Sequence, residues 1–401
     1  MTGCSRQRFF DEYVFPASDI SAEDDERSEE NALLGVGSKP SNMIELTSQE
    51  LVSSIRFGWN MGNSLEACLR DRDGDGNPDV LPAEVEQIEE TLWGNPAATR
   101  ELFKGLVDSG VNAVRLPITW RDHIDENGVI EINWLNRVEQ VVDYAYNCGL
   151  YVVINVYYDG SDDAEYGAWL RGAAKDAEVT LSRYTRLWEQ IAERFKNYNE
   201  RLIFESMDNV GFDMLMNDTA YELLNTLNQT FVDTVRSSGG NNDRRHLMVA
   251  GYFSDIGKTC DQRFHIPSDP AASCIVSVHY YTPWEFCTSD IQDSWGSYAE
   301  EREMDSLIEV LCDTFLHHGN AVIISEYGAR GDHDSVVYFC ERLVKLCRDS
   351  GIGCFIWDDG SLFDREEYEW RDTELLEAIL RASSGEDYTP QKGTSPDADV
   401  E

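Results

Sequence analysis

The sequence of 401 residues predicts an α/β fold, a (β/α)8 TIM barrel, on two observations. Over residues 46–383, short apolar runs alternate with longer segments of helical periodicity, a pattern typical of a parallel sheet with helical crossovers. Eight such units in about 340 residues suit a TIM barrel with insertions. The structural alternative is an open, doubly wound sheet, but the sequence lacks the glycine-rich phosphate-binding motif that would favour it.

The predicted strands are short apolar runs that end in polar residues. The third of them is almost continuously apolar, as expected of a strand that is buried on both faces. In chain order, the predicted strands are Ile55–Asn60, Val111–Pro117, Leu150–Val156, Leu202–Met207, His246–Ala250, Cys274–Tyr281, Ala321–Tyr327 and Ile352–Trp357.

The predicted helices carry the usual signals at their ends. Pro96 lies near the start of an amphipathic segment and Gly110 directly follows it, and Gly149 and Gly351 end two later helices in the same way. In chain order, the predicted helices are Pro96–Ser109, Asn133–Cys148, Leu181–Tyr198, Ala220–Ser237, Ala299–His317, Asp334–Asp349 and Asp372–Ala382.

The chain is strongly acidic, with a formal net charge of −42. Such a charge repels phosphate backbones and anionic lipid surfaces, so we expect neither nucleic acid nor a membrane surface as a partner. No run of about 18 apolar residues predicts a membrane span, and no signal segment is visible at the N-terminus. We expect a monomer with an acidic, disordered leader or linker at residues 1–45, the barrel at 46–383, and an acidic tail or linker at 384–401.

One segment has the spacing of a calcium loop, with oxygen ligands at alternate positions and a glycine at the sixth. Its twelfth position is Pro82 instead of the glutamate of an EF-hand, and a solvated acidic turn is the alternative interpretation. No other cofactor is expected, and the ten cysteines contain no C-x-x-C pair of the kind that binds zinc. The candidate calcium ligands are Asp71, Asp73, Asp75, Asn77 and Asp79.

Polar and aromatic residues gather where seven of the predicted strands end. In a TIM barrel the functional residues lie at the C-terminal ends of the strands. Glu326 is expected to face the mouth of the barrel and to pair with Arg115, because an arginine beside a carboxylate keeps it ionised. The residues at these strand ends are Asn60, Asn63, Arg115, His123, Asn155, Tyr157, Tyr158, Asp159, Asp208, Asn209, His279, Tyr281, Glu326, Trp357 and Asp358.

Six motifs resemble those of family 5 glycoside hydrolases, in order and with fitting spacing over about residues 48–382. The likeness leans towards the branch that acts on cellulose, xyloglucan and related β-1,4-glucans. The motifs are Gly58–Glu66 (GWNxGNxxEA in the family), Trp93–Pro96 (WGNP), Gly110–Trp120 (GxNxVRxPxxW), Val276–Trp284 (SxHYYxP), Ile324–Gly328 (I-G-E-F/Y-G) and Phe355–Gly360 (WWDNG).

This resemblance implies a retaining mechanism, in which one glutamate attacks the anomeric carbon and a second, about 5–5.5 Å away, protonates the leaving oxygen. Glu326 matches the nucleophile, and Trp357 matches the aromatic platform under the sugar. Arg115, His279 and Tyr281 match the residues that support the nucleophile. The polymeric substrates of the family imply a secreted or cell-surface location.

The sequence departs from the family pattern after the third and fourth predicted strands. The family has Asn-Glu after the fourth strand, where the glutamate is the acid/base, whereas this chain has Asp208-Asn209. An amide has no proton to give, and loss of a general acid/base removes about 10²–10⁴ in rate. Asp208 lies one residue away, which is expected to misplace it. Tyr157 and Tyr158 replace two histidines of the family.

Three hypotheses about function follow. The first is a barrel that binds β-1,4-glucan, with hydrolysis impaired or lost because Asn209 replaces the acid/base. The second is an active retaining endo-β-1,4-glucanase that uses Glu326 and a rearranged acid such as Asp208. The third is a non-catalytic acidic scaffold or adhesion domain. Whether the chain is an enzyme or a pseudoenzyme is left open. The expected substrate-binding residues are Arg115, His123, Tyr157, Tyr158, His279, Tyr281, Trp357, Asn60 and Trp284, with Trp120 as a further stacking surface.

Overall fold

The computed structural model describes residues 43–69, 89–157, 159, 169–212, 214–289 and 291–392. Eight strands form a closed barrel in which each strand is parallel to the next and β1 pairs with β8. The predicted TIM barrel is therefore confirmed. The strands are β1 (Gly58–Met61), β2 (Ala113–Leu116), β3 (Tyr151–Ile154), β4 (Leu202–Glu205), β5 (Leu247–Asp255), β6 (Cys274–Tyr280), β7 (Ala321–Tyr327) and β8 (Gly353–Asp358).

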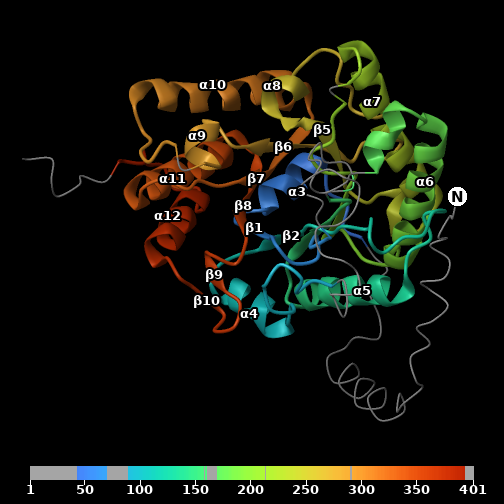
Figure 1. Ribbon diagram of the computed structural model, residues 1–401. Coiled ribbons are helices and arrows are strands. Elements are labelled where there is room, and N and C mark those ends of the chain that lie inside the picture. The colour runs from blue at the N-terminus through green and yellow to red at the C-terminus, as the bar shows by residue number, and fades with distance from the viewer. Residues whose placement is uncertain are drawn as a thin grey trace, which may run out of the picture. The chain divides into compact units, whose positions relative to one another are not determined.

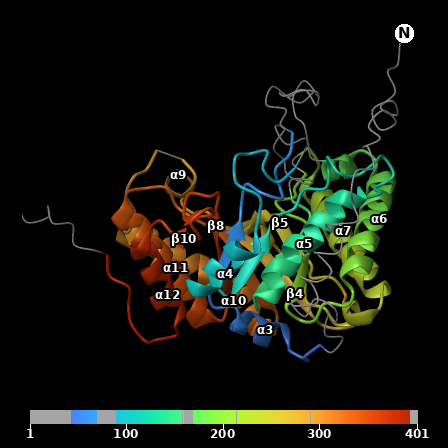
Figure 2. The ribbon, with the colours of Figure 1, turned by 90° about the horizontal axis from the view of Figure 1, so that it is seen from below.

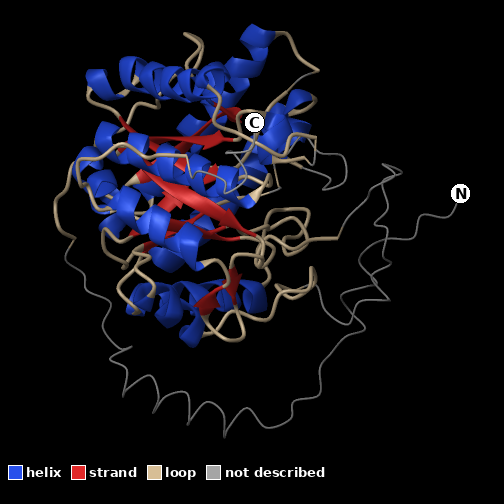
Figure 3. Cartoon of the chain, turned by 90° about the vertical axis from the view of Figure 1, so that its left-hand side faces the viewer, coloured by secondary structure: helices blue, strands red, loops and turns tan. Residues whose placement is uncertain are grey.

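Helices surround the barrel on the outside, as Figure 1 and the cartoon in Figure 3 show. Their apolar sides pack on the outer face of the sheet in one continuous core. None of the helices in the described ranges is long and apolar enough to cross a membrane. The main helices are α4 (Arg100–Asp108), α5 (Ile132–Asn147), α6 (Ala177–Phe195), α7 (Asn217–Ser237), α10 (Tyr298–Thr314), α11 (His333–Ser350) and α12 (Thr373–Ser383), and the short ones are α8 (Ile256–Thr259) and α9 (Trp284–Cys287).

An additional helix, α3 (Ser48–Ser54), was not predicted from the sequence. Thr47 begins it with a capping box, in which its hydroxyl accepts a hydrogen bond from the Glu50 amide and its own amide donates to the Glu50 carboxylate. Leu51 and Val52 face the apolar lower interior of the barrel. The helix lies across the barrel in Figure 1 and at its lower edge in Figure 2, so it covers the bottom.

The barrel interior is built in layers that follow the two-residue repeat of the strands. The lowest layer is apolar and includes Ala113, Val153, Ile203, Ile275 and Ile323. Two residues further along the same strands, the next layer is polar and consists of Arg115, Asn155, Glu205, Ser277 and Ser325, all of them buried. A charged hydrogen-bond network therefore lies directly above the apolar layer at the bottom of the barrel interior.

Segments beyond the predicted barrel boundaries also contact the barrel. The Ile44 amide donates to Glu200 at 2.9 Å. At the other end, the Tyr388 hydroxyl donates to Glu341 at 2.9 Å, and Lys392 donates to the Trp295 carbonyl at 2.5 Å. The cysteines of the described ranges are all free thiols, and each of them is buried or half-buried.

Candidate active site

Arg115 is the centre of the polar layer and is completely buried. Its guanidinium donates to three carboxylates, through Nε to Glu205 at 2.7 Å, through Nη2 to Asp208 at 2.6 Å and through Nη1 to Glu326 at 2.7 Å. Nη1 also donates to the Asn60 side-chain oxygen at 3.1 Å. One cation thus joins carboxylates from β4, the loop after it, and β7.

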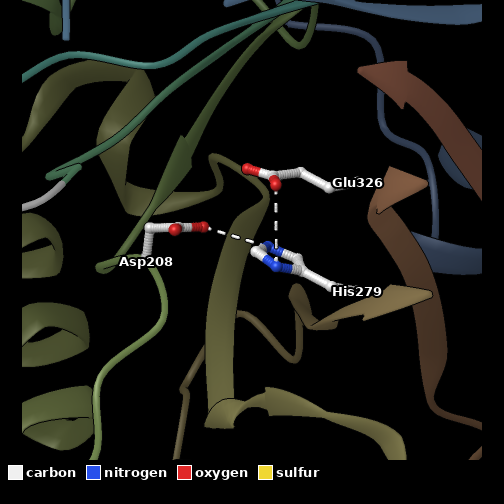
Figure 4. Close-up of side chains that lie close together, drawn as sticks. All are labelled: Asp208, His279 and Glu326. Atoms are coloured by element: carbon white, nitrogen blue, oxygen red, sulfur yellow. Dashed lines mark hydrogen bonds and ion pairs between the residues drawn. The ribbon is translucent and has the colours of Figure 1, made fainter. Parts of the chain in front are cut away.

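His279, near the end of β6, lies between two of these carboxylates, as Figure 4 shows. Its Nε2 is 3.0 Å from Asp208, and its Nδ1 is 3.7 Å from Glu326. The Tyr281 hydroxyl donates to Glu326 at 3.1 Å. Burial lowers the pKa of His279, but the negative charges of Glu326 and Asp208 raise it by more, so the imidazole is held above its usual pKa.

The pKa values of the two carboxyl groups at the mouth, Asp208 and Glu326, are shifted in opposite directions. Burial raises the pKa of Asp208, but attraction to His279 and Arg115 outweighs burial and lowers it below its ordinary value. The pKa of Glu326 is raised, by burial and by repulsion from Asp208, against the attraction of His279 and Arg115. Asp208 is therefore an anion at neutral pH, and Glu326 is the carboxyl that holds its proton longer.

Glu326 reaches the interior because the strand pairing is irregular at this point. The register of β7 shifts against β6 between Val278 and His279, and against β8 between Ile324 and Tyr327. Ser325 and Glu326 consequently both contact the polar layer, Ser325 through Ser277 at 2.8 Å and Glu326 through Arg115. The predicted position of Glu326 beside Arg115 agrees with this geometry.

Asp208 also lies within the cluster, contrary to the expectation that its displacement by one residue would misplace it. Strand β4 ends at Glu205, and beyond it the chain bends, so strict alternation no longer applies. One ligand atom from each of Asp208, His279 and Glu326 lies within 4.8 Å of the others. An oxygen of Asp208 and an oxygen of Glu326 therefore lie no more than 4.8 Å apart.

Asn209 follows Asp208 in a left-handed backbone conformation with φ of 50°, which asparagine tolerates better than most residues. The backbone N–H of Asn209 donates to the Ser254 hydroxyl at 3.3 Å, and the residue is half-buried. Its side chain carries no titratable proton. By sequence, Asp162, Asp163 and Glu165 are further candidates for the acid, and they lie outside the described residues.

Glu205 and Asn60 belong to the framework beneath the mouth. Glu205 accepts from Arg115, from Asn155 at 2.9 Å and from Ser277 at 2.6 Å, so it is a structural group within the barrel. Asn60 is fully buried and donates to backbone carbonyls of β7 and β8, including that of Ser325 at 2.9 Å. Asn60 therefore holds strands together, contrary to its prediction as a substrate-binding residue.

Several predicted aromatic residues lie at the mouth of the barrel. Trp357 is half-buried and stacks on Tyr157 with ring centres 5.9 Å apart and planes 14° apart. Tyr157 in turn lies under Arg115, whose guanidinium carbon is 5.5 Å from the ring centre. Trp284 at the start of α9 is 64% exposed. Tyr281 is half-buried beside Glu326, so Trp357, Trp284 and Tyr281 have exposed ring surface for stacking on a sugar, whereas the predicted binding residue Tyr157 is buried.

Two predicted binding residues lie elsewhere. Trp120 is fully buried, and its indole N–H donates to the Asn155 carbonyl at 2.9 Å, so its prediction as a stacking surface is wrong. His123 is buried in a stack with Trp134 at a centre distance of 3.9 Å and lies near Glu131, with no contact to the cluster among the described residues. Both positions follow β2, and both side chains are buried.

Sequence reasoning did not assign roles to Asn155, Ser277 and Ser325. Asn155 and Ser277 donate to the Glu205 carboxylate, and the Ser277 hydroxyl also lies 2.8 Å from that of Ser325. The available signal is the presence of polar residues at two-residue spacing inside otherwise apolar strands. Asp358 was predicted to lie at a strand end, but no role was predicted for it. It accepts from the Trp59 indole at 2.9 Å and from the Phe363 amide at 3.0 Å, and so fixes the loop after β8.

The cluster is better suited to its arginine than to a metal ion. Asp208, His279 and Glu326 each offer a ligand atom, but Arg115 already donates to both carboxylates. A second cation at this place would be repelled by the guanidinium. Tyr158 and the candidate calcium ligands Asp71, Asp73, Asp75, Asn77 and Asp79 lie outside the described residues.

A barrel whose mouth holds a carboxylate bound by an arginine and a tyrosine, beside aromatic side chains, defines a protein of the glycoside hydrolase class. Residues 75–361 match the sequence model described as cellulase, glycosyl hydrolase family 5, and the chain belongs to this family. Over 381 residues it is 33% identical to Endoglucanase A of Paenibacillus barcinonensis, with 85% of this chain and 91% of the relative covered.

Two solved structures support the same assignment. A broad-specificity endoglucanase of family 5 subfamily 4 from an uncultured bovine rumen ciliate aligns with a TM-score of 0.77 and 29% identity, over 85% of this chain and 99% of that one. A family 5 lichenase from Caldicellulosiruptor sp., in complex with cellotetraose, aligns with a TM-score of 0.75 and 30% identity, over 86% and 97%. Such relatives favour the hydrolase hypothesis over the binding-only one.

Proposed function

We propose that this protein binds β-1,4-glucan chains at the barrel mouth and that Glu326 attacks the anomeric carbon. Cleavage of an unactivated glucan is limited by the supply of a proton to the leaving oxygen. The observation that carries the proposal is a complete nucleophile network, in which Arg115 and Tyr281 both donate to Glu326, beside an amide at Asn209. The polymeric substrate supports a secreted or cell-surface location.

The chemistry divides into two steps that make different demands. In the first, a Glu326 oxygen bonds to the anomeric carbon while the glycosidic C–O bond breaks, and the departing oxygen must take up a proton unless it is already a stable anion. In the second, water displaces Glu326 and must lose a proton. Asn209 can serve neither transfer, so a glycosyl-enzyme formed from an activated substrate should persist.

A specific observation favours a second candidate function, a fully active endo-β-1,4-glucanase with Asp208 as the acid. Its carboxylate lies close to that of Glu326, and the relatives are endoglucanases by name. The opposing observation is that Arg115 and His279 hold the pKa of Asp208 below its ordinary value, which disfavours the protonated form that an acid needs.

The test compares an activated and an unactivated substrate. With 2,4-dinitrophenyl β-cellobioside we expect a burst of dinitrophenolate and a protein mass increased by one cellobiosyl group, both lost in Glu326→Gln. With carboxymethylcellulose or xyloglucan, sugar release should be about 10²–10⁴-fold slower than by Endoglucanase A of Paenibacillus barcinonensis assayed in parallel.

Other outcomes would redirect the assignment. Equal glucan turnover by the two proteins, abolished in Asp208→Asn while the aryl-glycoside burst remains, would establish Asp208 as the acid and contradict the proposal. Absence of a burst together with unretarded migration in a glucan affinity gel would leave the scaffold hypothesis.

A further inference from the structure

The carboxylate of Asp208, next to Asn209, belongs to the same ion-pair cluster as Glu326. Asp208 Oδ1 is 2.6 Å from Arg115 Nη2 and 3.0 Å from His279 Nε2. These are the same two cationic side chains that lie 2.7 Å and 3.7 Å from Glu326. An asparagine at position 208 would bring neither the charge nor the competition for these cations.

The charges that surround Glu326 can be counted strand by strand. Arg115 comes from β2, Glu205 and Asp208 from β4 and the bend after it, and His279 from β6. Tyr281 follows β6, and burial beside Glu326 holds its pKa well above the usual value, so it is a neutral donor. Tyr157 after β3 faces Arg115.

The cluster therefore contains three carboxylates and two cations, with the second cation present only while His279 is protonated. Without Asp208, the remaining two carboxylates would be balanced by Arg115 and the imidazolium. Buried charges interact over such distances with little screening by solvent. The extra carboxylate thus acts on Glu326 directly by repulsion and indirectly by engaging its partners.

We infer that Asp208 is a positioning residue that tunes the nucleophile, making Glu326 hold its proton more strongly than it would beside an asparagine. The inference rests on the proposed role of Glu326 as nucleophile. Its consequence is that the attacking form of Glu326 is reached at a higher pH in this protein. The repulsion from Asp208 that raises the pKa of Glu326 supports this direction.

The direct test is a carboxyl ¹³C NMR titration of protein labelled at the glutamate side-chain carboxyl, with the Glu326 signal assigned by its loss in Glu326→Gln. In Asp208→Asn the ionisation midpoint of Glu326 should fall by about one pH unit, which is a tenfold weaker hold on the proton. The His279 midpoint, followed by ¹⁵N signals of the imidazole, should fall as well, because its anionic partner is gone.

A matched control is Asp269→Asn, since Asp269 is also paired with an arginine, Arg236 at 2.7 Å, but lies before β6 and outside the cluster. It should leave the Glu326 midpoint unchanged. Circular dichroism confirms that the variants fold, and Asp208→Ser provides a second neutral replacement.

The kinetic counterpart is the pH dependence of the dinitrophenolate burst. Glu326 must be ionised to attack, so the burst rate falls as the pH drops below its midpoint, and Asp208→Asn should move this acid limb to lower pH by the same shift. An unchanged or higher Glu326 midpoint in both neutral variants would overturn the inference. Failure of the burst alone, with the NMR shift present, would instead count against the proposed function.

Discussion

At the scale of single residues, the consequential pair is Asp208 and Asn209. The mouth keeps the Asp208 carboxylate near Glu326, but that carboxylate is bound by a buried arginine and a histidine. Hydrogen bonds to the ionised form stabilise it and lower its pKa, so the carboxylate carries no proton to give at neutral pH. Chemical type alone does not decide whether a residue can donate a proton, because the neighbours set the pKa.

Introducing a carboxylate at the amide position should restore proton transfer. We expect Asn209→Glu to raise xyloglucan or carboxymethylcellulose hydrolysis by about 10²–10⁴-fold, while the aryl-glycoside burst changes little. Reducing-sugar release measures the effect, and Asn209→Gln is the size-matched control. No gain in Asn209→Glu, alone or combined with Asp208→Asn, would show that protonation does not limit turnover.

The sugar-stacking role of Trp357 can be tested at the same scale. Trp357→Ala removes the indole that packs on Tyr157, and loss of an aromatic stack should weaken cellotetraose binding by about 1–2 kcal/mol, or roughly tenfold. Isothermal titration calorimetry on the Glu326→Gln background avoids turnover. Trp120→Phe, at a fully buried tryptophan, serves as the comparison and should bind normally if the protein folds.

At the scale of elements, α3 contributes to the core although it belongs to no β/α unit. Leu51 is fully buried against the apolar floor of the barrel. Leu51→Ala should lower the free energy of unfolding by about 2–5 kcal/mol, since a cavity would remain in a closed barrel that cannot easily collapse. Urea denaturation measures this, and exposed Gln49→Ala on the same helix should change stability by less than about 0.5 kcal/mol.

The segment that leads into α3 adds a pH-dependent contact. His246, just before β5, has its Nε2 3.1 Å from the Leu46 carbonyl, and burial lowers its pKa to about 4. A base with a depressed folded pKa stabilises the fold fully above its unfolded pKa of about 6.5, and this contribution is lost as the pH falls towards 4.

The expected loss between pH 7 and pH 4 is on the order of 3 kcal/mol. The difference in unfolding free energy between the native protein and His246→Gln should therefore shrink as the pH is lowered over that range. Urea denaturation at several pH values gives both curves. A difference independent of pH would mean that His246 is not buried in its neutral form.

At the scale of the whole molecule, the dominant property is a net charge of −42. Self-repulsion of this size opposes the compact state, and salt weakens it because the screening length falls from about 30 Å at 0.01 M to about 10 Å at 0.1 M. We expect Tm to rise over this range in scanning calorimetry. Sodium chloride and sodium sulfate at equal ionic strength should act alike, whereas a larger effect of sulfate would indicate preferential exclusion instead of screening.

The barrel, its strand order and the identity of the nucleophile candidate followed from local pattern. Short buried runs such as Val322–Ser325 carry their own signature, and motif spacing brings Arg115 and Glu326 to the mouth once a parallel barrel is assumed. These properties depend on residues that are neighbours in the chain, so the sequence is sufficient to predict them. Helix α3 was missed because its apolar residues make sense only against a floor contributed by distant strands.

The protonation of the residues at the site could be inferred only from the tertiary structure. Arg115 and Glu326 are 211 residues apart in the chain, and the pKa of Glu326 depends on charges from several strands that meet only in three dimensions. The same holds for Trp120, which ends a family motif, and for His123, which follows it, because only the folded chain shows that both side chains are buried. Sequence position fixes which groups a chain carries, whereas burial and charge proximity, which are properties of the packed barrel, set what those groups can do.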